Sequence, residues 1–442
     1  MDRRRGQQQN HHHQNRRHRG SGWNPSPASY SNSRPTSASW DRDDDPSGGR
    51  VPATARRGGF TNRYVVPGVR SVVGGHGRRG GDEGYDDDEQ GKARANPDRE
   101  SPLVGTCPHM CPAAEIEQRE RLRDLASFER LHGNPAKTSP ELAVKKFCRT
   151  ISTKDVRPSD IRPIAVLERT LDYLMGLMDM SDKPFEIVHD FVFDRSRSVR
   201  QDMSMQNVVD RKAIQMYEKM AKFHVISHHK LRVSGQGSDE VIVSSWHHLN
   251  MEQMAKVLTS LYNLYDVNQL PNSLHENEAE YRSLYVLLCL GSDSLPEGET
   301  LPLWLRRVPS LVIKSKEMSF ARKVLRSVRV GNYKRFFDTV AAEASYLQYC
   351  AIGPSIDKVR ALALSCINTG GYKLHPYPIS HLSTLLRMKE SEMEAFCEAC
   401  NLATSFDEHG NMVLTTKQTG FTYPKRGFEK YSFTGTDENI GR

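Results

Sequence analysis

Two groups of cysteine and histidine residues are the strongest candidates for metal chemistry. Cys107, His109 and Cys111 form a Cys-x-His-x-Cys motif, and Cys397 and Cys400 form a Cys-x-x-Cys motif. A structural zinc ion takes four ligands, and no later pair of cysteines or histidines completes the first motif. The second motif falls on the apolar face of a predicted helix. Both patterns are more typical of buried thiols than of metal ligands, so we expect no metal and no other cofactor.

The sequence also lacks the short motifs that accompany most catalytic sites. It contains no nucleophile elbow, no phosphate-binding glycine loop and no His-Glu-x-x-His pair. The 17 histidines are scattered along the chain. We therefore expect that the protein is not an enzyme.

The densest group of opposite charges lies between Asp190 and Asp202. Within it, Asp194 and Arg197 are three residues apart, and Arg195 and Asp202 flank the next helical turn. Spacings of three and four residues allow ion pairs along one helix and its neighbour. The arginines could instead bind phosphate, but the acidic residues beside them oppose that. We favour the structural interpretation, in which these charges fix one helix against another.

Basic and aromatic residues gather near the end of the sequence, where they could contact nucleic acid. The candidates are Lys358, Arg360, Lys373, Arg387, Lys389, Lys417, Tyr423, Lys425, Arg426 and Lys430. Tyr423 and Phe428 lie among the last of these cations and are suited to stacking on bases. The helix predicted before them is acidic, with Glu392, Glu394 and Glu398. We therefore expect contact through the hairpin after that helix and the C-terminal arm; the alternative is a solvated basic face.

The first hundred residues differ in composition from the rest. Residues 1–100 contain no Leu, no Ile and a single Phe. Such a segment buries too little apolar surface to offset the entropy of ordering, so we expect disorder. Its Arg-Gly-Gly elements at 57–59 and 79–81 could bind RNA, or the segment could be a basic spacer. It carries +5 of the net charge of +8, which leaves a mild excess of +3 for the remainder.

Cysteine usage and the lack of a recognisable signal peptide indicate the cellular compartment. The eight cysteines are spread over the chain, and no signal peptide precedes them. No apolar run approaches the roughly 18 residues of a transmembrane helix. This pattern indicates free thiols in a reducing compartment and no insertion into a membrane.

Helical periodicity begins after residue 111 and continues for most of the chain. We expect helices over 112–132, 167–178, 185–200, 208–229, 254–265, 281–288, 315–330, 332–340, 343–351 and 356–368. The fold class is therefore mainly α. A succession of amphipathic helices with short breaks favours a helical-repeat solenoid, of the kind built by TPR and PCI-like proteins, although no fixed sequence repeat is found.

The sequence from Tyr377 onward has a different pattern. A short extended piece precedes two helices, which we expect Ser380 and Ser391 to cap. Segments 403–406 and 412–415 then flank a turn, as in a β-hairpin. Helix, turn, helix and hairpin is the order of a winged helix. We predict a disordered Arg/Gly-rich tail at 1–103, a helical-repeat region at 104–352, a winged helix at 353–420 and a basic arm at 421–442.

Several ordered motifs resemble those of one protein family. They are Gly-Thr-Cys-Pro-His-Met-Cys-Pro at 105–112, Ile-Arg-Pro at 161–163, the charged stretch at 190–206 and Gly-Asn-Tyr-Lys-Arg-Phe-Phe at 331–337. Together they are similar to the Sac/GANP family of mRNA-export scaffolds. The residues that match the family's structural motifs are Cys107, Met110, Cys111, Pro112, Glu115, Arg119, Asp190, Asp194, Arg195, Arg197, Arg200, Gln201, Asp202, Asn332, Tyr333, Arg335 and Phe336.

The resemblance implies a nuclear scaffold whose helical repeat ends in a PCI-like winged helix. It implies a PCI-domain partner whose winged helix lies beside this one and forms a platform for RNA or DNA. It also implies a small, acidic, disordered subunit of the Sem/DSS type, and a role in a transcription-and-export (TREX-type) complex at the nuclear pore, with pore components bound indirectly. The alternative is a protein-binding relative that acts in centrosome or spindle organisation, or in transcription-coupled RNA processing.

Overall fold

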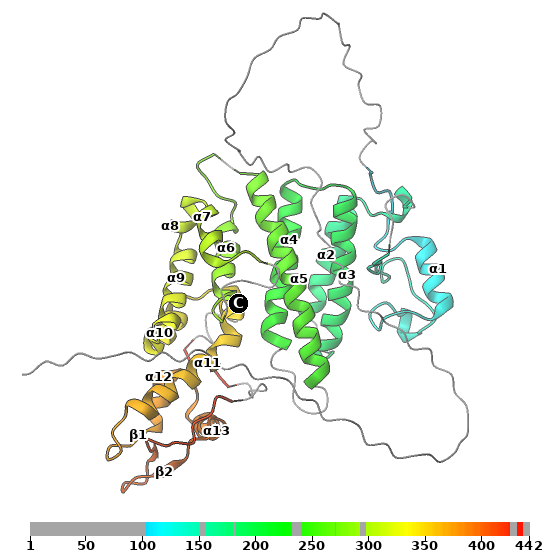
Figure 1. The fold of residues 1–442 in the computed structure, drawn as a ribbon. Helices are drawn as coiled ribbons and strands as arrows, with labels where there is room; N and C mark the ends of the chain where they lie inside the picture. The colour runs from blue at the N-terminus through cyan, green and yellow to red at the C-terminus, as the bar shows by residue number, and fades with distance from the viewer. Residues whose placement is uncertain are drawn as a thin grey trace, which may run out of the picture. The chain divides into compact units, whose positions relative to one another are not determined.

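The computed structural model describes residues 103–150, 156–179, 182–231, 240–269, 271–291, 298–424 and 431–435. The tail predicted to be disordered lies outside these residues, except for Leu103. The described chain is mainly helical, with one small three-stranded antiparallel sheet near its C-terminal end (Figure 1). This confirms the predicted mainly α class.

The secondary structure of the described chain comprises short 3-10 turns, α-helices and three strands. The turns are η1 (Leu131–Gly133), η2 (Pro158–Asp160) and η3 (Leu177–Asp179). The α-helices are α1 (Ala113–Leu122), α2 (Ile164–Gly176), α3 (Phe185–Met205), α4 (Arg211–Leu231), α5 (Glu240–Val267), α6 (Glu278–Leu288), α7 (Leu301–Arg307), α8 (Ser310–Lys314), α9 (Lys316–Arg329), α10 (Tyr333–Glu343), α11 (Tyr346–Gly370), α12 (Ile379–Leu386) and α13 (Glu390–Ala399). The strands are β1 (Tyr377–Pro378), β2 (Thr404–Phe406) and β3 (Met412–Leu414). None of the helices in these described ranges combines the length and the apolar character that crossing a membrane requires.

Helix α1 is shorter than the sequence predicts. It ends at Leu122, and Arg123 adopts a left-handed conformation with φ of 53°. The chain then continues without an α-helix through Thr150, so the helix predicted over 112–132 is wrong in its second half. The reversal at Arg123 allows the buried Glu129 to pair with Arg119. In a continuous helix these two residues would lie about 15 Å apart along the axis.

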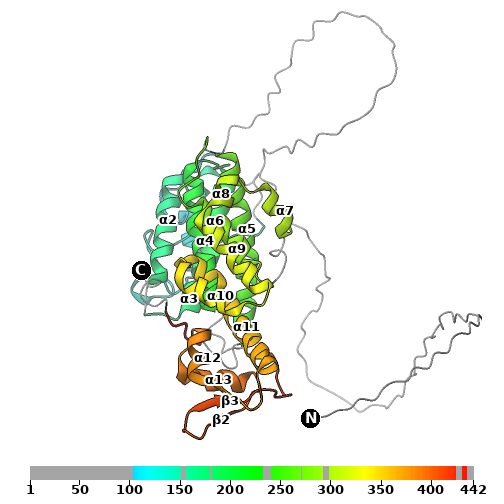
Figure 2. The same ribbon diagram turned by 90° about the vertical axis from the view of Figure 1, so that its left-hand side faces the viewer.

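Helices α2 to α5 form the first part of the core. Their apolar residues recur at spacings of three and four, so each helix presents an apolar face. Leu167 and Leu171 of α2, Phe223 of α4 and Tyr265 of α5 are fully buried. Helices α4 and α5 lie side by side in both views (Figures 1 and 2). The helices predicted at 167–178, 185–200, 208–229 and 254–265 are thus present with shifted ends.

Helices α6 to α11 continue the helical body. Helices α9 and α10, present where the sequence predicts helices at 315–330 and 332–340, form an antiparallel pair joined by a turn in which Gly331 has φ of 69°. Helix α11 is continuous where the sequence predicts two helices at 343–351 and 356–368, and it contains Pro354. A proline removes one hydrogen bond within a helix. In this protein α11 packs against α4 and α6, and these contacts offset that loss.

The C-terminal elements combine two helices with the sheet. The strand order is β1-β3-β2, with Tyr377 opposite Leu414 and Phe406 opposite Met412. Asp407 closes the hairpin, because its Oδ1 accepts hydrogen bonds from the N–H groups of His409 at 2.9 Å and Asn411 at 2.8 Å. Helices α12 and α13 pack against each other. The hairpin and both helices were predicted from the sequence.

The predicted serine caps of these two helices are wrong. Helix α12 begins directly after Pro378, and α13 begins directly after Lys389. Ser380 and Ser391 are therefore the second residues of these helices and do not cap them. Pro378 is also the last residue of β1, opposite Val413 of β3. The strand pairing therefore sets where α12 starts.

Candidate nucleic-acid interface

The charged motif residues near the start of the described chain form two buried clusters. In the first, which we call the Glu129 cluster, the Glu129 carboxylate accepts hydrogen bonds from Arg119 and, at 3.0 Å, from Arg195. It also accepts bonds from the backbone N–H groups of Ala126 and Val144, each at 3.0 Å. Burial alone would raise the pKa of Glu129, but Arg195, Arg119 and these bonds hold it below its usual value.

The second group, the Asp202 cluster, joins three of the sequence motifs. Asp202 accepts hydrogen bonds from Lys145 Nζ at 2.7 Å and from Arg162 Nε at 2.7 Å. Arg162 and Asp202 are fully buried. Arg162 also donates to the carbonyl of Met110 at 3.2 Å and to Ser198 Oγ at 3.0 Å. The cluster therefore connects segments 105–112 and 161–163 to helix α3.

The charges of α3 fix that helix to the irregular segment before it. Asp194 accepts a hydrogen bond from the N–H of Phe147 at 3.3 Å, and the guanidinium of Arg197 lies 3.9 Å from the centre of the Phe147 ring. These two charged residues therefore contact an irregular segment, whereas the sequence predicts contact with a neighbouring helix. Because these carboxylates and guanidinium groups engage groups of the same protein, the geometry favours a structural role over a phosphate site.

The other motif residues serve the core and the helix ends. Pro112 precedes α1 as its N-cap residue. Asn332 caps α10, because its Oδ1 accepts a hydrogen bond from the N–H of Arg335 at 3.0 Å. Phe336 is fully buried. The side chains of Arg335 and Asp190 are exposed, so burial in the fold does not explain these two residues.

The cysteines of both candidate metal motifs are buried thiols. Burial raises the pKa of Cys397 and of Cys400 to about 12. It also raises the pKa of Cys107 and of Cys111. Metal ions bind the thiolate, and these groups stay protonated near neutral pH. Among the described residues, no group of three or more His, Cys, Asp or Glu side chains is arranged to hold a metal ion.

The candidates for nucleic-acid contact come from several separate segments. Lys358, Lys373, Lys389, Lys417 and Tyr423 are exposed, and Arg387 is half-buried. Lys425, Arg426, Phe428 and Lys430 lie outside the described residues. The exposed lysines belong to α11, to the loop before β1, to the start of α13 and to the segment after β3. That these residues form one surface for nucleic acid therefore stays a prediction.

Arg360 is wrong as a surface candidate, because it is fully buried. It pairs with Asp357 at 3.0 Å and donates to the carbonyl of Leu386 at 3.1 Å. It also donates to the carbonyls of Arg387 and Ser432, each at 2.7 Å. The guanidinium thus fastens the C-terminal end of α12 and the segment at 431–435 to α11.

Two further candidates have structural contacts that limit their availability. Lys417 donates to the carbonyl of Thr369 in the last turn of α11, where the negative end of the helix dipole favours a cation. Arg387 pairs with Asp338 of α10 at 3.2 Å. Both side chains therefore contribute to the packing of the C-terminal elements.

Helices α12 and α13 and the hairpin carry a net negative charge. Residues 377–415 contain six Asp and Glu against two Lys and Arg, a net charge of −4. Glu390, Glu394 and Glu398 are exposed at four-residue spacing on α13. Such a face repels phosphate, as expected for a helix that does not enter a nucleic-acid groove.

Positive charge is concentrated in residues 301–343 instead. This segment holds ten Lys and Arg against three Asp and Glu, a net charge of +7. The sequence-based prediction did not include it, because charge was counted over the whole folded part, where the excess is only +3. Counting the charge of each pair of successive predicted helices separately would have found this positive segment.

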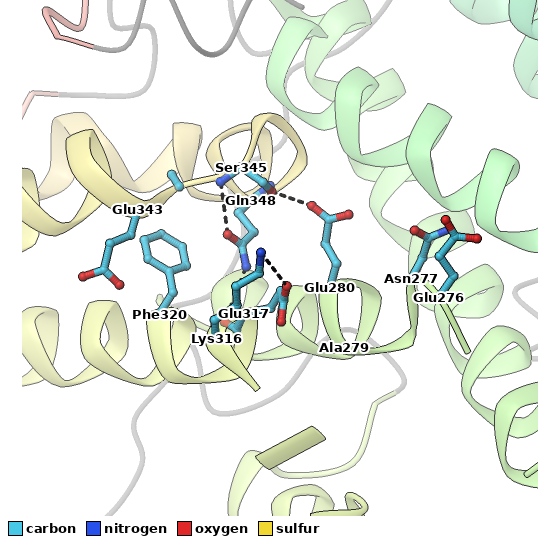
Figure 3. Close-up of a pocket in the computed structure, with 11 residues that line it drawn as sticks. Glu276, Asn277, Ala279, Glu280, Lys316, Glu317, Phe320, Glu343, Ser345 and Gln348 are labelled. Atoms are coloured by element: carbon cyan, nitrogen blue, oxygen red, sulfur yellow. Dashed lines mark hydrogen bonds and ion pairs between the residues drawn. The ribbon is translucent and has the colours of Figure 1, made fainter. Parts of the chain in front are cut away.

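A cavity of about 550 Å³ lies where helices α6, α9 and α11 begin, and Figure 3 shows the residues that line it. It is lined by Glu276, Asn277, Ala279, Glu280, Lys316, Glu317, Phe320, Glu343, Ala344, Ser345 and Gln348. Glu280 accepts a hydrogen bond from Ser345 Oγ at 2.5 Å. Carboxylates in the first turns of α6 and α9 interact favourably with the positive ends of these helices. The acidic lining is unsuited to a phosphate backbone, so this cavity is not part of the candidate interface.

Comparison with known proteins gives a consistent set of relatives. SAC3 family protein B of Arabidopsis thaliana is 34% identical over 325 residues, which are 72% of this chain and 19% of that protein. SAC3 family protein 1 of Schizosaccharomyces pombe is 31% identical over 337 residues, 72% of this chain and 32% of that protein. Protein xmas of Drosophila melanogaster is 26% identical over 339 residues, 73% of this chain and 16% of that protein. The chain thus spans less than a third of the length of each of these relatives.

The sequence model of the SAC3/GANP family matches residues 110–406. This range contains the Glu129 and Asp202 clusters, helices α1 to α13 and strands β1 and β2. Because the match extends over more than half of the sequence and includes both buried clusters, the chain belongs to the SAC3/GANP family.

Proposed function

We propose that the chain is a scaffold subunit of a nuclear mRNA-export complex of the transcription-and-export type, and that it acts by binding rather than by catalysis. The observation that carries the proposal is the SAC3/GANP match over residues 110–406. This family is generally associated with mRNA-export complexes. The helical body and the buried charge clusters are consistent with a rigid support on which other macromolecules assemble.

The C-terminal elements support a PCI-like winged helix. Helices α12 and α13 precede the β2–β3 hairpin, and β1 adds a third strand beside β3. Order and pairing of this kind are typical of winged helices. The paired helices α4–α5 and α9–α10 are similarly typical of a helical repeat.

A protein partner is supported by exposed apolar side chains near the sheet. Tyr372 is 78% exposed, Leu374 89% and Phe406 70%. Large apolar side chains left in water at this level favour a protein contact. The partner we propose is a PCI-domain subunit with its own winged helix, and the Sem/DSS-like acidic subunit is the proposed third component. RNA or DNA would bind to the assembly, and the nuclear pore is its proposed location.

Affinity purification from nuclear extract, followed by mass spectrometry, tests the proposal. We expect the tagged full chain to recover a PCI-domain protein, and the recovered complex to bind RNA. Phe406→Ser with Leu374→Ser, which removes two of these exposed apolar side chains, should reduce recovery of the partner without changing helical content. Recovery of the chain alone under gentle conditions would count against the scaffold role. Recovery of centrosomal proteins without RNA affinity would favour the alternative in spindle organisation.

A further inference from the structure

Helix α9 carries a row of exposed cations along one side. Arg322, Arg326 and Arg329 follow one another at spacings of four and three residues, and all three are exposed. With 3.6 residues per turn they fall within an arc of about 60°. The distance along the axis from Arg322 to Arg329 is about 10 Å. The row therefore forms a continuous positive edge rather than scattered charges.

Two more cations stand where α10 begins. The N–H of Asn332 donates to the carbonyl of Ser327 at 2.9 Å, so the start of α10 lies beside the end of α9. Figures 1 and 2 show the two helices side by side. Lys334 and Arg335 are exposed in the first turn of α10, which contains no acidic residue.

Helix stability does not explain these two residues. The positive end of the helix dipole disfavours cations at an N-terminus, although it favours the glutamates found in the first turns of α6, α9 and α13. Arg326 and Arg329, in contrast, stand in the last turn of α9, where the dipole favours them. Lys334 and Arg335 therefore point most directly to a ligand of negative charge.

The nearby carboxylates are engaged by other cations. Glu343 pairs with Lys323 at 2.9 Å, and Asp338 pairs with Arg387 at 3.2 Å. Within the described residues, no ion pair joins Arg322, Arg326, Lys334 or Arg335 to a carboxylate. The positive charge of these four side chains is thus available to an external group.

The surroundings of the row favour nucleic acid over a protein. The exposed side of α9 also carries Ser319, and Asn332 follows in the turn. Val330, 66% exposed, is the large apolar side chain beside them. Protein interfaces have an apolar core, whereas nucleic-acid interfaces are more polar and strongly positive.

We propose that Arg322, Arg326, Lys334 and Arg335, which we call the α9–α10 cation surface, bind the phosphate backbone of RNA. The inference rests on the proposed function and places the main nucleic-acid contact on the helical body, away from α13. The arginine side chains can donate two parallel hydrogen bonds to one phosphate. The exposed glutamates of α13 keep the backbone from the C-terminal helices.

Charge reversal tests this surface in the full chain with its co-purified partner. The variants are Arg322→Glu with Arg326→Glu, and Lys334→Glu with Arg335→Glu. The control is Arg211→Glu with Lys222→Glu, which reverses two exposed cations of α4. A labelled oligouridine is titrated with each protein at several salt concentrations, and circular dichroism verifies that all variants fold alike.

We expect each α9–α10 variant to lower the slope of log K against log salt by about 1.4, because each lost contact to single-stranded nucleic acid removes about 0.7. At about 0.1 M salt this slope change corresponds to roughly 25-fold weaker binding. The control should retain the wild-type slope.

The outcomes separate this inference from the proposed function. If the wild type binds oligouridine and both α9–α10 variants bind as the control does, the cation surface is wrong while the scaffold role stands. If the wild type binds neither oligouridine nor oligodeoxythymidine, the nucleic-acid part of the proposed function fails as well. Displacement of oligouridine by polyglutamate at equal charge concentration would assign the surface to an acidic protein and overturn the inference.

Discussion

Replacing Glu129 with Ala removes the carboxylate that Arg119 and Arg195 share inside the protein. Glu129 is fully buried, and both arginines are about 4% exposed. Loss of the carboxylate leaves two buried guanidinium groups without their main counter-charge. Removing one partner from a buried ion pair typically costs about 3–5 kcal/mol. A loss of this size is a large share of the roughly 5–15 kcal/mol by which a domain is stable.

Urea unfolding followed by circular dichroism measures this loss, and hydrogen exchange locates it. The N–H groups of Ala126 and Val144, which donate to Glu129, should lose protection first. Glu117→Gln is the matched control, because Glu117 is exposed on α1. Such a surface change should stay within about 0.5 kcal/mol of the wild type.

A triple replacement tests the same charge triad in a second way. Arg119→Met, Glu129→Leu and Arg195→Met together remove every charge of the triad and keep similar volumes. Replacing a buried ion triad by apolar groups is often neutral, and Asp194, the other partner of Arg195, is partly exposed, so the triple variant should be more stable than Glu129→Ala. Two results would refute the reasoning. One is a Glu129→Ala variant as stable as the wild type, and the other is a triple variant less stable than Glu129→Ala.

Three further substitutions or conditions test other parts of the fold. Arg360→Ala removes the guanidinium that pairs with the buried Asp357 carboxylate and donates to three backbone carbonyls, so we expect a loss of about 3–5 kcal/mol and faster proteolysis at 431–435. A Cβ on Gly353 would lie 2.2 Å from an imidazole of α4, whereas one on Gly370 would meet nothing within 4 Å. Gly353→Ala should therefore destabilise the protein by about 1–3 kcal/mol, and Gly370→Ala should leave it unchanged or stabilise it by about 0.5 kcal/mol, as thermal melts can show. Burial lowers the pKa of His189 to about 4 and of His224 to about 3. Unfolding restores a pKa near 6.5, so below that pH the unfolded state binds protons that the folded state does not. The free energy of unfolding should therefore be full above about pH 6.5 and fall as the pH falls, by about 2 kcal/mol for each histidine at pH 5. Urea midpoints that do not change between pH 7 and pH 5 would contradict this.

The positions of most helices could be predicted because they depend on local periodicity. The end of α1 could not, because the pairing of Arg119 with Glu129 across a chain reversal decides it. The continuity of α11 through Pro354 likewise depends on packing against other helices. In both cases a contact between distant parts of the chain overrides the local preference.

The candidate site was harder to predict, because burial is a tertiary property. In the sequence Arg360 resembles any other basic residue, yet it is enclosed by carbonyls from α12 and from 431–435. The cations of α9 and α10 were predicted to lie on helices but not to form a surface. Only the turn at Gly331 brings the end of one helix beside the start of the next.

The contrast between buried and exposed arginines separates the residues that build the scaffold from those available for binding. Arg162 is fully buried and satisfied by Asp202, Ser198 and a backbone carbonyl. A buried guanidinium is unfavourable unless its donors are satisfied, so Arg162 favours the arrangement of segments that supplies these acceptors. The motifs that identify the family are therefore explained mainly by folding. Arg335 and Asp190 are exceptions, because both belong to the motifs and their side chains remain exposed. An exposed cation in the first turn of a helix is disfavoured by the helix itself, and contact with an external phosphate supplies the missing reason for the position of Arg335.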